Sequence, residues 1–319
     1  MTNKDINIVA QNTQSTVVAQ YTPSKKRAEH YQSEDALEKD FIKQLESQAY
    51  EYLKITKNDD LVNNIRLQLE KLNNYKFSDY EWGNFFRWEI ANPNQSIEEK
   101  TTTIQEDYIK ILQCDNGTSK NIYLLDKKNI HNNNLQVINQ YATDEGQRSN
   151  RYDVTILVNG FPMVHIELKR RWVAIQEAFN QINRYQRESF WADSGLFEYV
   201  QLFVISNGTL TKYYSNTTRF KHTSEKEKTK GKKSSDSFEF TNWWADFSNK
   251  PLSDLMDFSR TFFAKHTILN VLTKYCVFTF DKQLLVMRPY QIAATEKIID
   301  KINISSNYKK YGSVESGGY

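Results

Sequence analysis

Two carboxylic acids and one amine stand close together in the stretch RYDVTILVNGFPMVHIELKRR. Asp153 lies in a run of alternating residues, and Glu167 and Lys169 end a second such run. Because successive side chains of a strand point to opposite faces, Glu167 and Lys169 share one face. If the two runs pair as an antiparallel hairpin in the right register, Asp153 joins them there. The three groups could then act together on one substrate.

The register that brings the two acids together also fixes the connection between the strands. If Asp153 lies opposite Glu167, then Thr155 lies opposite His165, because directly opposed residues share a face. The connection is then about five residues long, 158–162, which is within the usual range for hairpins.

A tighter connection is the alternative. A two-residue turn at Asn159-Gly160 would place Asp153 opposite Ile166 and divide the charged residues between the two faces. Pro162 cannot donate a hydrogen bond to a neighbouring strand, which favours its placement in a loop. We therefore predict the longer connection.

Two carboxylates that converge on one point repel each other unless a cation lies between them. Mg²⁺ suits such a site because it binds oxygen and keeps several waters, and the Leu168 carbonyl could supply a further ligand. Lys169 could orient or deprotonate a water, or stabilise developing charge. The metal would acidify the water and neutralise phosphate charge, so phosphodiester hydrolysis is the predicted reaction. An amphipathic hairpin whose charged face meets solvent is the alternative.

A helix is predicted from about residue 172 to 187, because apolar residues recur there at helical spacing, at Ile175, Phe179 and Ile182. Gln181 and Tyr185 are four residues apart and share a face. They could reach the metal site or a backbone phosphate, or they could form a half-buried helix edge.

These residues resemble a known family of nucleases. Asp153, Glu167-Leu168-Lys169 and the trailing Gln181-x-x-x-Tyr185 look like the PD-(D/E)xK signature. The combination is similar to the N-terminal nuclease domain of the restriction (motor) subunit of type I restriction–modification enzymes.

The resemblance implies an α/β fold with a mixed central sheet flanked by helices. It implies that Asp153, Glu167 and Lys169 are catalytic, with Mg²⁺ held by the two acids and the Leu168 carbonyl. The residues expected to position the site or the DNA are Gln181, Tyr185, Arg170 and Arg184.

The first helix is predicted to follow a flexible polar arm without regular structure, residues 1–30. Ser33 is a plausible N-cap, and acidic residues fill the first turn. In the resembling nucleases the first helix often contributes a carboxylate to the metal site. Glu38 and Glu34 both remain candidates, and either could instead be solvated helix surface.

The rest of the predicted endonuclease domain, 31–258, alternates strands with helices, which indicates an α/β core. A hairpin is predicted at 201–215, with its turn at Asn207-Gly208. The lysine-rich segment 221–237 cannot bury a core and is predicted to be a mobile loop.

Residues 259–319 are predicted to be a linker and the truncated start of a RecA-like motor domain. The segment Met287-Arg288-Pro289-Tyr290-Gln291 resembles the element before the first nucleotide-binding motif of superfamily 2 helicases, in which Gln291 would contact adenine. No Gly-x-x-x-x-Gly-Lys-Ser/Thr occurs, so ATP is expected only for a longer subunit.

Bulk properties narrow the function classes. The net charge is only +3, but residues 148–187 hold seven Lys/Arg against three acids, two of which are the proposed ligands. A positive rim around an anionic site suits a phosphodiester substrate. Two cysteines give no disulfide framework, and no apolar stretch is long enough for a membrane span. A cytoplasmic protein is expected.

The expected function is therefore that of a Mg²⁺-dependent DNA endonuclease domain. By resemblance, it would cut unmethylated double-stranded DNA after ATP-driven translocation, in a complex with methylation and specificity subunits. A non-catalytic DNA-binding or assembly module with a nuclease-like fold is the alternative. An RNA- or repair-directed nuclease would share the chemistry, but the helicase-like tail argues against it.

Overall fold

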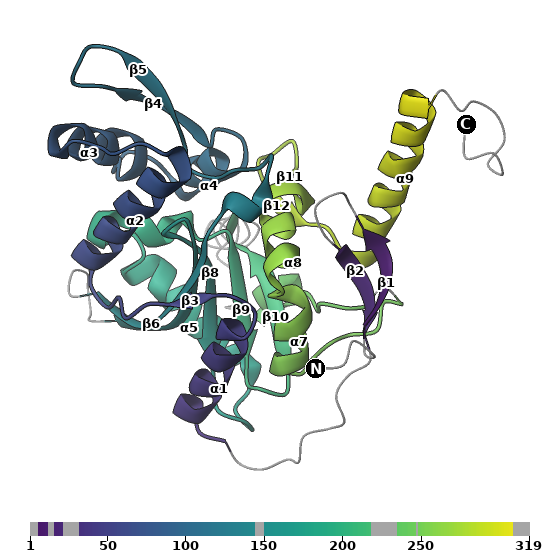
Figure 1. The fold of residues 1–319 in the computed structure, drawn as a ribbon. Helices are drawn as coiled ribbons and strands as arrows, with labels where there is room; N and C mark the ends of the chain where they lie inside the picture. Colours follow the sequence, from purple (N-terminus) through teal and green to yellow (C-terminus); the bar gives the residue numbers. More distant parts are fainter. Residues whose placement is uncertain are drawn as a thin grey trace.

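The computed structural model describes residues 6–11, 16–21, 32–143, 150–217, 235–246 and 248–308. A mixed six-stranded sheet lies at the centre in the order β10-β9-β8-β7-β6-β3 (Figure 1). Its strands are β3 (Glu51–Tyr52), β6 (Leu135–Thr143), β7 (Asn150–Val158), β8 (Phe161–Leu168), β9 (Leu202–Ser206) and β10 (Thr211–Ser215). The β8–β9 and β3–β6 pairs are parallel and the others antiparallel. The expected mixed α/β core is confirmed.

The β7–β8 hairpin has the predicted strand register. Thr155 pairs with His165, and the same register leads to Asp153 and Glu167 across from each other. Both strands are almost entirely buried because they lie in the middle of the sheet. The charged face is therefore an interior surface rather than a solvated one.

The predicted long connection between these strands is wrong. Asn159 and Gly160 form a two-residue turn with φ values of 50° and 86°, the left-handed conformations that tight hairpin turns require. A β-bulge places Leu157 opposite Pro162 and leaves Met163 as the extra residue on β8. Because the bulge shifts the pairing by one residue, a tight turn and the charged register occur together.

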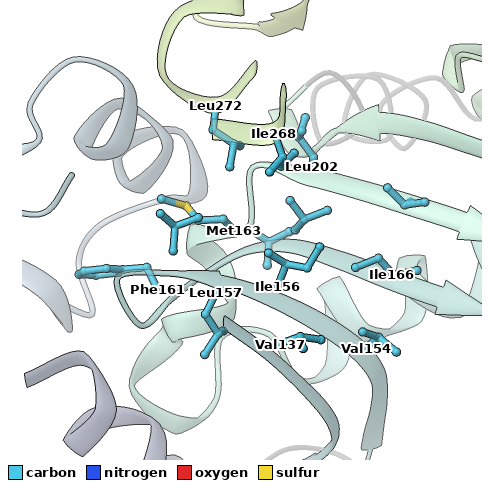
Figure 2. Packing of buried hydrophobic residues seen from close by; sticks show 14 of the residues in the cluster. Val137, Val154, Ile156, Leu157, Phe161, Met163, Ile166, Leu202, Ile268 and Leu272 are labelled. Atoms are coloured by element: carbon cyan, nitrogen blue, oxygen red, sulfur yellow. The ribbon is translucent and has the colours of Figure 1, made fainter. Parts of the chain in front are cut away.

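Helices cover both faces of the sheet. These are α1 (Glu34–Glu46), α5 (Ile175–Glu188), α7 (Leu255–Phe262) and α8 (Lys265–Asn270). Ser33 caps α1 as predicted, since its hydroxyl accepts from the Ala36 N–H. Figure 2 shows Ile268 of α8 and Leu272 beside Leu202, on the face opposite the charged residues. Tyr185 of α5 packs on the charged face, against His165.

The remaining elements form two extensions (Figure 1). At one end are α2 (Asn58–Asn73), α3 (Asp79–Phe85), α4 (Ile97–Gln105) and the hairpin of β4 (Ile109–Gln113) and β5 (Ser119–Tyr123). At the other are β1 (Ile6–Gln11), β2 (Thr16–Tyr21) and α9 (Pro289–Tyr308). A short hairpin of β11 (Cys276–Phe278) and β12 (Leu284–Val286) lies between the two extensions, beside β10. Helical turns at 86–90, 130–132, 193–199, 235–240 and 271–275 complete the described chain.

The expectation of an arm without structure at the N-terminus is wrong for 6–11 and 16–21. These residues form the β1–β2 hairpin, which contacts α8 and α9. Tyr21 also donates a hydrogen bond of 2.9 Å to Asp257. The rest of the expected arm, apart from these two strands, lies outside the described residues.

The predicted boundary between 258 and 259 falls inside α7. Beyond it, Phe263 packs on Phe41 with ring centroids 5.8 Å apart, and its carbonyl accepts from Tyr50. Of the predicted mobile loop, 221–234 lies outside the described residues. Among the helices that the structure describes, none is both long and apolar enough to cross a membrane.

Substitution of Gly160 tests how closely the hairpin turn packs against α2. A Cβ on Gly160 would lie 2.7 Å from the Ile65 Cα, whereas a Cβ on Gly117, which has a similar φ of 80°, would meet nothing within 4 Å. We predict that Gly160→Ala lowers the free energy of unfolding by about 2–4 kcal/mol, and Gly117→Ala by about 1 kcal/mol. Urea denaturation of both variants measures the difference, and equal losses would contradict the close packing.

Candidate active site

The two predicted acids converge on the buried face of the β7–β8 hairpin. Asp153 is 8% exposed and Glu167 is fully buried. The Asp153 Oδ2 accepts a hydrogen bond of 2.9 Å from the Leu168 N–H, which ties the carboxyl of β7 to the backbone of β8. The structure therefore brings together both acids and the backbone of Leu168.

Lys169 lies beside this pair at the end of β8. Its Nζ donates to Glu167 Oε1 at 3.1 Å and to the Leu168 carbonyl at 2.9 Å, and lies 3.4 Å from Glu34 Oε1. Burial alone would lower the pKa of Lys169, but the charges of Glu167, Asp153 and Glu34 outweigh it and the pKa is raised. The ammonium group therefore stays charged.

Both acids hold their protons more tightly than exposed carboxyls do. Burial and then the charge of Glu167 raise the pKa of Asp153 to about 8, against the lowering effects of the Leu168 N–H and Lys169. Burial raises the pKa of Glu167 to about 7, although Lys169 lowers it. Lys169 alone does not compensate both carboxylates, so the ionised pair would be stabilised by a further cation.

The donor set fits a hard divalent ion. Oε2 of Glu167 is buried and has no hydrogen-bond partner within the described chain. No group of three or more His, Cys, Asp and Glu with metal-binding geometry occurs among the described residues. Mg²⁺ does not need one, because it is commonly held by one or two carboxylates together with waters. Asp153, Glu167 and the Leu168 carbonyl meet that requirement.

The structure distinguishes the two acids of the first helix. Glu34, at the start of α1, reaches Lys169. Glu38 accepts instead from Asn139 Nδ2 at 2.6 Å and from Gln140 Nε2 at 2.5 Å, and burial raises its pKa. Glu34 is therefore the first-helix acid that lies at the site, and Glu38 ties α1 to β6.

Gln181 and Tyr185 share a face of α5, as predicted. The Tyr185 hydroxyl accepts from Gln181 Nε2 and donates to the Arg151 carbonyl at 2.9 Å. Burial, and then the charge of Glu167, raise the pKa of Tyr185. The Gln181–Tyr185 pair therefore connects α5 to β7 behind the acids.

The arginines predicted to position DNA lie around the site. Arg170 is exposed directly after Lys169. The Arg184 guanidinium lies 5.5 Å from the centre of the Tyr185 ring, and its Nε is buried without a hydrogen-bond partner in the described part of the chain. Arg170 is thus the one that faces solvent.

His165 also lies on the charged face and was not predicted as a site residue. It is fully buried, with Nε2 3.4 Å from Glu167 Oε2 and Nδ1 3.2 Å from Thr155 Oγ1. Burial lowers the pKa of His165 to about 4, so the ring is neutral. His165 lies two residues before Glu167 on the same strand, so strand alternation puts both side chains on one face. That spacing could have identified His165 as a site residue.

Gln291 lies apart from the acids, at the start of α9. Its side-chain oxygen accepts from the Arg288 N–H at 2.8 Å. It lines a cavity of about 420 Å³ together with residues of β10 and β12, including Tyr213 and Leu284. Gln291, which was predicted to contact adenine, therefore borders a cavity that Asp153 and Glu167 do not line.

Comparison with known proteins identifies relatives of the chain. The family model described as "Type I restriction enzyme R protein N terminus" matches residues 31–222. The chain is 48% identical over 298 residues to the type I restriction enzyme EcoprrI endonuclease subunit of Escherichia coli, which covers 93% of this chain and 91% of that protein.

Two staphylococcal proteins are more distant. The SauMSSORF170P endonuclease subunit of Staphylococcus aureus (strain MSSA476) is 34% identical over 283 residues. The SsaAORF53P endonuclease subunit of Staphylococcus saprophyticus is 35% identical over 283 residues. Each alignment covers 87% of this chain but 28% of the relative, so the chain spans less than a third of these proteins.

The raised pKa of Asp153 predicts how stability changes with pH. Between its usual value of 3.8 and its folded value of about 8, the folded state binds the proton more tightly than the unfolded state. The free energy of unfolding of the metal-free protein therefore falls as pH rises through this window. Asp153→Asn removes the part of that fall that comes from Asp153 and leaves the part that comes from Glu167, so we predict that it is more stable than wild type at pH 8 by on the order of 1 kcal/mol or more.

Urea denaturation at several pH values measures the effect, with Asp300→Asn, an exposed position on α9, as the matched control. The control should follow the wild-type curve. If Asp153→Asn lost stability with pH as steeply as wild type does, the buried pair would not be its cause.

Proposed function

The chain belongs to the family of type I restriction enzyme R protein N termini, and from this premise we propose that its hairpin site is a Mg²⁺-dependent DNA endonuclease centre. The observation that carries the proposal is the convergence of Asp153, Glu167 and Lys169 on one buried face. The names of the relatives, all endonuclease subunits, support a restriction nuclease role.

Each side chain has a distinct task in the proposed reaction, which is hydrolysis of a DNA phosphodiester bond. Asp153, Glu167 and the Leu168 carbonyl would hold Mg²⁺, which when bound would acidify a water and neutralise charge on the scissile phosphate. Lys169 would orient the attacking water and stabilise charge on the phosphate oxygens. Glu34 lies close enough to Lys169 to keep its amine at this place.

Residues around the acids would position the DNA. Arg170 is exposed and adjacent to Lys169, so it can meet a backbone phosphate directly. Arg184, held against Tyr185, would support the same edge of the site. Gln181 and Tyr185 would act through the backbone of β7, where the Arg151 carbonyl accepts from Tyr185.

The wider proposal concerns a longer subunit. We propose that such a subunit, together with modification and specificity subunits, cuts unmethylated foreign DNA after ATP-driven translocation. Residues around Gln291 would form the start of the motor domain, with the glutamine at an adenine site. The cavity that Gln291 borders supports this assignment.

Removal of the Lys169 amine tests the nuclease assignment. In a complex reconstituted with modification and specificity subunits, Mg²⁺ and ATP, we predict that Lys169→Ala lowers the rate of DNA cleavage by about 10²-fold or more, since it removes the group that acts on the water. ATP hydrolysis should change little and the fold should be retained, with a lower melting temperature for the metal-free chain because the buried Glu167 loses its ammonium partner. Cleavage is measured on unmethylated DNA that carries the recognition sequence.

Lys39→Ala is the matched control, because Lys39 is an exposed lysine that pairs with Asp35 across one turn of α1. It should cut as wild type does. Wild-type cleavage by Lys169→Ala would contradict the catalytic role. If the wild-type chain took up no divalent ion in a calorimetric titration, a non-catalytic DNA-binding module would be the better account.

A further inference from the structure

His165 occupies an aromatic cage on the buried side of the site. Its ring centre lies 5.7 Å from that of Tyr152, 6.1 Å from Tyr185, 5.8 Å from Phe190 and 6.4 Å from Phe203. An apolar side chain would suit such surroundings. A buried imidazole is costly there unless both of its nitrogens have partners.

Two side chains offer polar groups to the two nitrogens, and the Val154 backbone carbonyl is a further acceptor for a ring N–H. Thr155 Oγ1 lies 3.2 Å from Nδ1, across the β7–β8 pair. Oε2 of Glu167 lies 3.4 Å from Nε2, two residues further along β8. Both Nε2 and Oε2 are buried, and neither atom has a hydrogen-bond partner in the part of the chain that the structure describes, so the 3.4 Å contact between them falls short of a hydrogen bond.

The Thr155 hydroxyl and the Glu167 carboxylate together favour one tautomer of the ring. Within the described residues the Thr155 side chain has His165 Nδ1 as its hydrogen-bond partner. The hydroxyl proton is satisfied only if Nδ1 accepts it, and a neutral ring then carries its own proton on Nε2. That proton faces the Glu167 carboxylate. The opposite tautomer would leave the hydroxyl proton unbonded and turn a lone pair toward an anion.

The Nε2–Oε2 separation of 3.4 Å is longer than an ideal hydrogen bond. Such bonds in the absence of ligand are often long and tighten when the site is assembled. Ionised Glu167 is the better acceptor, and ionisation is the state that a metal ion requires of it. Contraction of this contact should therefore accompany metal binding.

We propose that His165 is a positioning residue of the metal site, which holds the Glu167 carboxylate by donating its Nε2 proton to Oε2 while the Thr155 hydroxyl fixes its tautomer. The inference rests on the proposed function. Oε2 has two lone pairs, so it can accept from His165 and still serve as a metal ligand, while Oε1 accepts from the Lys169 amine at 3.1 Å. Partners that orient a ligand from behind commonly change metal affinity by about 10–100-fold.

Calorimetric titration of Mn²⁺ into the whole chain tests the role without any need for cleavage. We predict that His165→Leu, which fills the cage but has no donor, weakens Mn²⁺ binding about tenfold or more. His165→Gln keeps an N–H donor and should stay within about threefold of wild type. Melting temperatures of both variants show whether the fold is retained.

Phe190→Leu is the matched control, since it loosens the same cage and leaves the His165–Glu167 contact in place. It should lower the melting temperature while its Mn²⁺ affinity stays within about threefold of wild type. Equal affinity of His165→Leu and wild type would overturn the inference. Equal weakening by His165→Leu and His165→Gln would overturn it as well.

The tautomer has its own readout. A long-range ¹H–¹⁵N spectrum of the metal-free chain, recorded above the Glu167 pKa of about 7, should show the His165 proton on Nε2. The His165→Leu spectrum identifies the signal among the five histidines. Thr155→Val should shift the ring toward the other tautomer, and a proton on Nδ1 in wild type would overturn the inference.

These measurements separate the inference from the function on which it rests. Absence of Mn²⁺ uptake by the wild-type chain would overturn the proposed function and the metal part of the inference together. Uptake that His165→Leu leaves unchanged would overturn the inference alone.

Discussion

The energetic cost of burying two like-charged carboxyls side by side determines how this site is built. Asp153 and Glu167 lie in the middle of a sheet, where water cannot screen their repulsion. The protein meets this cost in part with the Lys169 ammonium and the Leu168 N–H, and the raised pKa values of both acids show what remains. A divalent cation is the natural complement of such a site.

The scaffold has to place these acids with the accuracy of a single residue, because a shift of one position would send every side chain of β8 to the opposite face. The bulge at Met163 and the tight turn at Asn159-Gly160 provide that accuracy together. The Asn159 side chain donates to the Leu124 carbonyl, and the Gly160 Cα lies close to α2. Contacts with Leu124 and α2 thus hold the turn in place. The turn and the bulge together set the strand register that brings the two acids to one face.

Much of this arrangement could be read from the sequence, because it depends on local periodicity. Once the two acids were assumed to share a face, alternation placed Thr155 opposite His165, and a serine followed by acids marked the start of α1. The bulge could not be predicted, since one extra strand residue leaves no mark in the alternation unless the turn is already known. Pro162 argued for a loop, but it lies opposite Leu157 within the ladder.

Tertiary contacts decided what periodicity left open. Glu34 and Glu38 lie one helical turn apart, and only the position of α1 against β8 and β6 assigns the first to Lys169 and the second to Asn139. The β1–β2 hairpin also depends on tertiary contacts that local sequence does not reveal, because its strands contact α8 and α9, which lie far away in the sequence.

The most direct test of the central claim is anomalous diffraction from crystals of this chain grown with Mn²⁺. We expect an anomalous peak between the Asp153 and Glu167 carboxylates and beside the Leu168 carbonyl, with the Lys169 amine moved off that carbonyl. A map with no peak there, in which Lys169 still bridges Glu167 and the carbonyl at full Mn²⁺ concentration, would contradict it.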